Sequence, residues 1–226
     1  MKKDNNKKCA KIIKNLNALG HLITNIKFNY GILCSVYDHK YEIEDIEFKD
    51  FECALNNFIL TASIVKQHIK SFEKDLDETF IKTKKYQKVK TALFDNEWHL
   101  ILLGLRNYIQ HVFHIKISFG NALSENPDEE DLFITNFTLI KHKELHTNKP
   151  GNIALNNYFK YCFALPIMPF ATENMCLIDR FYKQYDKVVH EHYKSILAKY
   201  NSVKDVDQYA MDMHDIYFAN LNSFKD

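Results

Sequence analysis

Apolar residues recur every three or four positions over much of the chain, and this spacing is typical of amphipathic helices. In the first half, segments 9–26, 51–80 and 97–113 have this pattern. One face of 51–80 stays apolar for about eight turns. Either Asp95 or Asn96 is suited to cap the third segment. The first half of the chain is therefore predicted to be helical.

The spacing of apolar residues changes from the helical period to alternation after the third helix. Residues 113–119 alternate between apolar and polar, and 131–141 are rich in β-branched and aromatic residues, so we expect a β-hairpin. Thr172 is the expected cap of a helix that reaches Leu197, and a last helix is expected over 206–221. The predicted fold class is mainly α, a helical bundle with a small inserted β-hairpin and C-terminal helices.

Composition agrees with a globular protein built as a single domain. Apolar residues make up 46% of the 226 residues and charged residues 26%, and no segment resembles a linker. We expect one domain over 1–226, in which 1–114 form the helical core, 115–145 the hairpin and 150–226 the C-terminal helices.

Net charge and cysteine usage narrow the class of protein further. A formal net charge of +1 gives no overall electrostatic case for nucleic-acid binding, which leaves only a local basic patch. The five cysteines are scattered without a CxxC pair, and no apolar leader begins the chain. No apolar run approaches the roughly 20 residues that cross a bilayer. These features predict a soluble, cytoplasmic protein with reduced thiols and no contact with a membrane.

The segment "LRNYIQHVFH", residues 105–114, has the most unusual combination of side chains. The chain contains only two arginines, and Arg106 lies here inside a helical pattern. At about 100° per residue, the apolar residues of this helix share one sector and the polar residues the opposite sector. The polar sector contains His99, Arg106, Asn107, Gln110, His111 and His114. We therefore expect all side chains with acid, base or cationic chemistry to face away from the core.

The outward side of this helix also contains apolar and small residues. Leu100, Leu103 and Gly104 lie in the turns just before the polar cluster. Apolar residues on an outward face indicate that something covers it, and a second copy of the same helix is one expected partner. A small residue such as Gly104 allows a partner backbone to approach closely.

Arg106, Asn107 and His111 read Arg-Asn-x-x-x-His, which on a late helix of a helical bundle resembles the R-x4-6-H signature of HEPN domains. The motif spans six residues, and the wider helical similarity covers about residues 45–114. The resemblance implies a metal-independent endoribonuclease of the kind found in toxin, phage-defence and RNA-processing systems. It also implies a homodimer in which two motifs form one composite site. The hairpin and C-terminal helices lie outside the general HEPN pattern.

The residue types suit cleavage of RNA by its own 2′-hydroxyl. His111 is the candidate for proton transfer because histidine titrates near neutrality. Arg106 is the candidate for the phosphate because its planar fork donates two parallel hydrogen bonds. Asn107, about 40° from His111 around the helix, can orient the imidazole or bind a phosphate oxygen. Gln110 and His114 are the expected substrate contacts on the same face.

Lys85 and Lys88 belong to a lysine-rich run, 82–90, that can guide an RNA backbone toward the helix. A solvated loop and first helical turn is the competing interpretation of this run. Similarly, Arg106 can form a structural ion pair, and His111 can be a satisfied interface histidine. The alternative function is therefore a non-catalytic helical module that binds RNA or a protein partner.

No cofactor or metal site is predicted. The chain has no P-loop, GxGxxG or GxSxG motif. The pairs His142 with His146 and His190 with His192 lack a third ligand at metal-binding spacing. The expected partners are a second copy of the chain, an RNA substrate and a cognate antitoxin protein.

Overall fold

The computed structural model describes residues 2–38, 47–112, 115–120, 131–135 and 147–197. These residues form a mainly α fold with a small antiparallel sheet, so the predicted fold class is confirmed. In chain order the elements are α1 (Lys2–Asp38), α2 (Glu47–Ser63), α3 (Val65–Phe72), the 3-10 helix η2 (Glu73–Asp75), α4 (Glu78–Ile81), α5 (Lys84–Phe94), α6 (Glu97–Val112), β1 (Ser118–Gly120), β2 (Asp131–Thr135), α8 (Pro150–Tyr161), β3 (Ala164–Pro166) and α9 (Ile167–Leu197).

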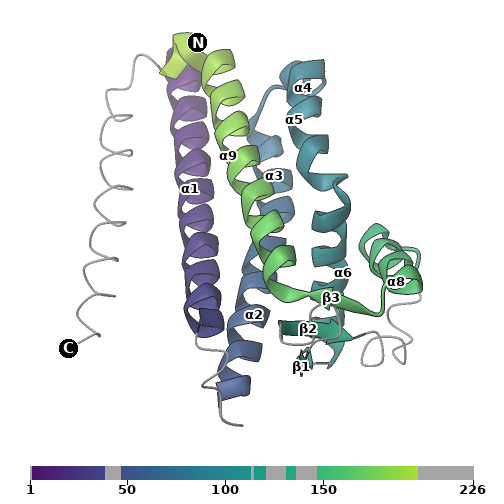
Figure 1. Ribbon diagram of the computed structural model, residues 1–226. Helices are drawn as coiled ribbons and strands as arrows, with labels where there is room; N and C mark the ends of the chain where they lie inside the picture. Colours follow the sequence, from purple (N-terminus) through teal and green to yellow (C-terminus); the bar gives the residue numbers. More distant parts are fainter. Residues whose placement is uncertain (1, 39–46, 113–114, 121–130, 136–146, 198–226) are drawn as a thin grey trace, which may run out of the picture.

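The described helices form antiparallel columns along one long axis (Figure 1). Helix α1 runs from one end to the other, α2 and α3 return, α5 and α6 run back again, and α9 completes the bundle beside α1. Helix α8 packs on α6, and the sheet lies at the end of the bundle where α6 ends. The helix with the Arg-Asn-x-x-x-His motif therefore has both α8 and the sheet as neighbours.

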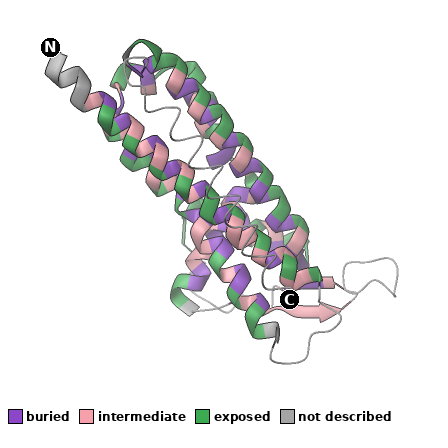
Figure 2. Cartoon of the chain, turned by 90° about the vertical axis from the view of Figure 1, so that its left-hand side faces the viewer, coloured by how far each residue is buried: buried purple, intermediate pink, exposed green. Residues whose placement is uncertain are grey.

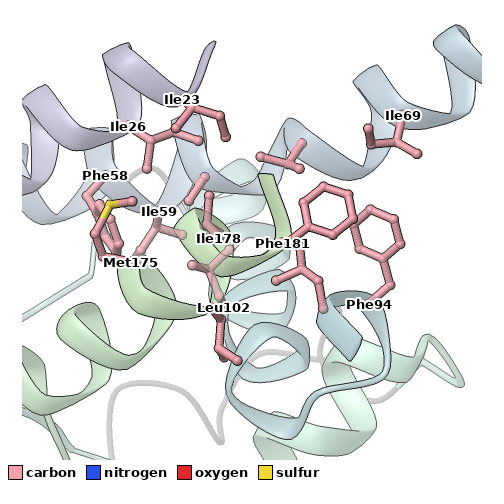
Figure 3. Packing of buried hydrophobic residues seen from close by; sticks show 14 of the residues in the cluster. Ile23, Ile26, Phe58, Ile59, Ile69, Phe94, Leu102, Met175, Ile178 and Phe181 are labelled. Atoms are coloured by element: carbon pink, nitrogen blue, oxygen red, sulfur yellow. The ribbon is translucent and has the colours of Figure 1, made fainter. Parts of the chain in front are cut away.

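An apolar cluster fills the space between the columns. In Figure 3, Ile26 of α1, Ile59 of α2 and Leu102 of α6 meet Ile178 and Phe181 of α9. Figure 2 shows that buried residues lie where the helices face one another and exposed residues on their outer sides. Burial of apolar area contributes about 25 cal/mol per Å², so these inward faces hold the columns together.

The predicted continuous helix over 51–80 was wrong, because the chain breaks after Ser63 and again at Leu76. The Ser63 hydroxyl donates to the Leu60 carbonyl oxygen at 2.7 Å, and such a bond competes with the helical ladder. Ile64 is 44% exposed at the break, and Leu76 has an extended backbone. The apolar face nevertheless continues through α2, α3 and α4, since their core residues are buried.

Helix α6 begins as the sequence indicates. The Asn96 side-chain oxygen accepts a hydrogen bond from the Trp98 backbone N–H at 2.9 Å. Asn96, rather than Asp95, is therefore the residue whose side chain caps this helix. The lysine-rich run before it is also helical, since α5 begins after Thr83, whose hydroxyl accepts from the Tyr86 N–H.

The predicted hairpin is confirmed in β1 and β2, which pair antiparallel with Ser118 opposite Phe133. A third strand, β3, was not predicted, and it pairs with β2 so that Phe133 also lies opposite Pro166. The central strand buries Leu132, Phe133 and Ile134. Residues 136–141, which the sequence assigns to the second strand, lie outside the described residues.

The predicted start of the following helix was wrong, because α9 begins at Ile167 rather than after Thr172. Pro169 fits within the first turn, where backbone N–H groups have no intrahelical acceptor. Thr172 lies on the exposed side, with its hydroxyl oxygen 2.9 Å from that of Tyr30. The helix expected over 206–221 lies outside the described residues.

Two further findings concern membrane spans and disulfide bonds. Within the described ranges, no helix combines the length and apolar character needed to cross a membrane. The five cysteines all lie within the described residues and form no disulfide bond there.

Candidate functional site

The motif helix α6 has a buried face and a polar edge. The residues of its core face, each at most 5% exposed, are Ile101, Leu102, Leu105, Tyr108 and Ile109. On the polar edge Arg106 and Asn107 are half-buried, whereas Gln110 and His111 are exposed. His114 lies outside the described residues. The candidate residues therefore differ in environment, with the arginine partly enclosed and the histidine in solvent.

A line of hydrogen bonds connects the arginine to α8. The Asn107 amide nitrogen donates to the Asn152 side-chain oxygen at 2.8 Å. The Asn152 amide nitrogen in turn donates to the Thr147 hydroxyl at 2.7 Å. Arg106 Nη1 donates to the Asn107 side-chain oxygen across a long 3.5 Å contact. Asn107 is therefore held by α8 and by Arg106, and its amide is aimed at these two groups rather than at His111.

Asn152 was missed by sequence reasoning, although it is fully buried and fixes Asn107. A buried amide is stable only when its polar atoms are paired, so the two asparagines depend on each other. A signal existed in the neighbouring Gly151. Only five glycines occur in the chain, and a glycine within a helix allows another backbone to approach closely.

Helix α8 of the same chain covers the side of α6 that contains Gly104. A Cβ atom built on Gly104 would lie 2.5 Å from the Gly151 carbonyl oxygen, and one built on Gly151 would lie 2.8 Å from the Gly104 backbone nitrogen. The inference that a small residue admits a close backbone is thus confirmed. The expected second copy of α6 on this side was wrong, because α8 already occupies it.

Gly104→Ala is expected to lower the free energy of unfolding by about 1 kcal/mol. The added Cβ meets rigid atoms, the Gly151 carbonyl oxygen at 2.5 Å and Leu155 Cβ at 2.8 Å, so α8 must shift. Overpacking of this kind typically costs about 1–3 kcal/mol, and the gain of about 1 kcal/mol in helix propensity offsets only part of it. Urea denaturation measures the change.

Gly31→Ala is the matched control, because a Cβ on Gly31 of α1 meets nothing within 4 Å. This variant is expected to be as stable as the wild type or more stable, since alanine favours the helix. If Gly104→Ala shows the same gain as Gly31→Ala, the close approach of α6 and α8 does not exist in solution.

His99 does not belong to the polar edge, contrary to its position on the helical wheel. Its side chain is 0% exposed, and its ring centroid lies 5.9 Å from that of Phe94. Neither ring nitrogen has a hydrogen-bond partner among the described residues. Burial and the positive charge of Lys66 lower the pKa of His99 from 6.5 to about 4. His99 is therefore neutral at physiological pH and packs against Phe94 at the end of α5.

The lysines predicted to guide RNA lie far from the motif. Lys85 is in the first turn of α5, at the opposite end of the α5–α6 column from His111 (Figure 1). Its ammonium forms an ion pair with Glu191 of α9. Lys88 is exposed on the same helix. The structure therefore does not bring these two lysines together with Arg106 and His111.

Arg106 and His111 are separated on one helix by about 7.5 Å along the axis and about 140° around it. Within the described residues, no hydrogen bond joins them. The arginine can bind an anion at the edge beside α8, while the histidine can exchange protons with a ligand in solvent. In a single copy these two groups thus act on neighbouring but separate parts of one helix.

No group of three His, Cys, Asp or Glu side chains in the described part of the chain is placed to hold a metal ion. His190 lies 3.1 Å from Asp186, and the His192 ring stacks on Phe80 at 4.1 Å between centroids. His142 and His146 lie outside the described residues. No protein-family model matches the chain, and no curated protein or solved structure is significantly similar to it.

Proposed function

We propose that this chain is a metal-independent endoribonuclease that cleaves RNA through attack of the 2′-hydroxyl on the adjacent phosphate. The observation that supports this best is the state of Arg106. Its guanidinium is half-buried, and its one hydrogen bond to a described residue goes to the Asn107 amide. The competing interpretation needs a carboxylate partner, which the described residues do not supply. A partly enclosed arginine without a counter-charge is suited to bind a phosphate.

His111 supplies the proton transfer in this proposal. It lies exposed in the last turn of α6 and has no hydrogen-bond partner among the described residues, so both ring nitrogens are accessible to a substrate. As a base it removes the 2′-hydroxyl proton, and as an acid it protonates the leaving 5′-oxygen. Arg106 stabilises the negative charge that develops on the phosphate between these two steps.

A homodimer completes the proposed site. Two copies related by a twofold axis would place two Arg106 and two His111 side chains around one phosphate, so that one histidine acts as base and the other as acid. Gly104 and His111 lie on the same side of α6, about two turns apart, and α8 covers this side at Gly104, so the pairing surface is the exposed last turn with Gln110 and His111. The resemblance to HEPN domains favours a toxin or phage-defence effector, which a cognate antitoxin would control.

Arg106→Lys is expected to lower the single-turnover rate of RNA cleavage in EDTA by about 10²-fold. Lysine keeps the charge but loses the planar fork that donates two hydrogen bonds to the phosphate. Arg180→Lys, at an exposed position of α9, is the matched control and is expected to cleave at the wild-type rate. Cleavage by Arg106→Lys at the wild-type rate would contradict the role given to the guanidinium, and absence of cleavage by the wild type itself would favour the alternative, a non-catalytic helical module that binds RNA or a protein partner.

A further inference from the structure

Lys66 lies beside the first turn of α6. Its ammonium is 5.7 Å from the centroid of the Phe94 ring, and the Phe94 ring is 5.9 Å from that of His99. The lysine belongs to α3, the phenylalanine to the end of α5 and the histidine to α6. Packing on an aromatic ring holds the ammonium in place while leaving it in contact with water.

Lys66 is on the same side of the column as Arg106. His99 and Arg106 are seven residues apart on α6, which is two turns, so their positions differ by about 20° around the axis and about 10 Å along it. Phe94 lies between the Lys66 ammonium and the His99 ring, so Lys66 is beside the first turn of α6, about two turns before Arg106. The two cations are therefore separated mainly along the helix axis.

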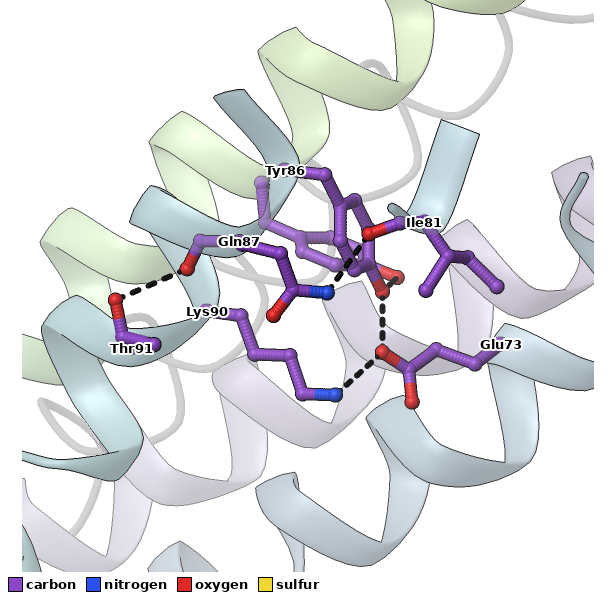
Figure 4. A network of polar contacts seen from close by, with 7 residues as sticks. Glu73, Ile81, Tyr86, Gln87, Lys90 and Thr91 are labelled. Carbon is purple, nitrogen blue, oxygen red and sulfur yellow. Dashed lines mark hydrogen bonds and ion pairs between the residues drawn. The ribbon is translucent and has the colours of Figure 1, made fainter. Parts of the chain in front are cut away.

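Positive charge is concentrated around Lys66. Lys70 follows it by one turn on α3, and burial together with the charges of Lys70 and Lys90 lowers the pKa of Lys66, while only Asp95 raises it. The charge of Lys90 is paired, because its ammonium donates a hydrogen bond to the Glu73 carboxylate at 2.7 Å (Figure 4). Neither Lys66 nor Lys70 forms an ion pair with any described residue. These two cations are therefore not paired within the described residues, and Asp95 is the acidic group whose charge acts on Lys66.

We propose that Lys66 and Lys70 extend the Arg106 site into a track for the backbone of single-stranded RNA. The inference rests on the proposed function, since it takes Arg106 as the phosphate-binding end of the track. Lys70 and Lys66 on α3 and Arg106 on α6 form a series of cations along the bundle, and a single strand, whose phosphates repeat along one direction, can follow such a series. Lys66 and Lys70 thus replace Lys85 and Lys88, of which Lys85 is engaged by Glu191.

The test measures RNA binding separately from cleavage. Fluorescence anisotropy follows a labelled single-stranded RNA with 2′-O-methyl groups, which cannot be cleaved through the 2′-oxygen, over a series of salt concentrations. The variant Lys66→Gln/Lys70→Gln is compared with Lys85→Gln/Lys88→Gln, which removes the same charge elsewhere. Thermal unfolding followed by circular dichroism checks that both variants are folded.

If the track exists, Lys66→Gln/Lys70→Gln is expected to weaken RNA binding about tenfold. The slope of log affinity against log salt is expected to fall in magnitude by about 1.4, which is about 0.7 for each phosphate that the variant no longer neutralises. The control variant is expected to bind as the wild type does. Equal losses of affinity in the two variants, no binding by the wild type, or equal binding of poly-glutamate would each overturn the inference.

Cleavage of unmodified RNA, measured in parallel, separates this inference from the proposed function. If the wild type binds through Lys66 and Lys70 but leaves unmodified RNA intact, the track stands and the ribonuclease proposal fails. If the wild type cleaves RNA while Lys66→Gln/Lys70→Gln binds and cleaves normally, the ribonuclease proposal stands and the track is wrong.

Discussion

His111→Ala is expected to lower the rate of RNA cleavage by about 10²–10⁴-fold, the range that a positioned general acid or base contributes. The residue is exposed in the last turn of α6 and contacts no described hydrogen-bond partner, so its removal leaves the fold intact. Single-turnover cleavage in EDTA measures the rate. Circular dichroism and the urea midpoint of the variant are expected to match those of the wild type.

His21→Ala is the control for loss of a histidine, because His21 is exposed on α1, away from α6. It is expected to cleave at the wild-type rate. If a purified wild type cleaves RNA and His111→Ala cleaves equally fast, His111 is not the group that transfers the proton, and the site must be sought elsewhere. A variant that unfolds would be replaced by His111→Gln, which keeps a polar side chain of similar size.

Acidification from pH 7 to pH 4 is expected to lower the free energy of unfolding by about 3 kcal/mol through His99 alone. In the folded chain burial holds the pKa of His99 at about 4, whereas its ordinary value is 6.5. Between these values the unfolded chain binds a proton that the folded chain does not. The contribution of His99 to the free energy of unfolding is therefore fully present above pH 6.5. It falls by about 1.4 kcal/mol per pH unit as the pH drops toward 4.

His99→Leu tests this effect, because the apolar side chain removes the titration and leaves no ring nitrogen unpaired. Urea denaturation at several pH values is expected to show that the advantage of the variant over the wild type grows as the pH falls from neutrality toward the pKa of His99. The paired carboxylates of Asp75, Asp77 and Asp179, whose pKa values are lowered from 3.8, lose their stabilisation at lower pH. Parallel pH curves for the two proteins would show that His99 is accessible to water.

The core face of α6 and its beginning were predictable, because both depend on local rules. Apolar spacing places Leu102, Leu105 and Tyr108 in the core, and a short polar side chain before Glu97 indicates a cap. The break after Ser63 was not visible in the same pattern. Apolar residues keep helical spacing across it, while a side-chain hydrogen bond and tertiary packing decide where the helix stops.

The outward side of α6 was only partly predictable. His99 and Arg106 lie about 20° apart on the helical wheel, yet one is fully buried and the other half-buried. The difference arises from the neighbours at each level, since Phe94 of α5 packs against His99 whereas the last turn of α6, with Gln110 and His111, is exposed. Periodicity within a helix indicates which residues share a side, but it does not indicate which neighbour covers that side at each level.

The contacts of Asn107 likewise could not be predicted from the pattern within α6. Its motif position is visible in the sequence, whereas its partner Asn152 is 45 residues away and comes close only because α8 packs on α6. The pair of glycines at this contact, Gly104 and Gly151, was the available sequence signal. Non-local pairing of this kind depends on the path of the chain through β1, β2 and the segments around them, which no local pattern specifies.

The ribonuclease proposal is tested most directly by the ends of the RNA products released in EDTA by the purified wild type and by His111→Ala. We expect cyclic 2′,3′-phosphate and 5′-hydroxyl ends from the wild type and intact RNA from the variant, because the 2′-oxygen attacks and His111 transfers the proton. Intact RNA with both proteins, or the same products from both, would contradict the assignment of cleavage to this helix.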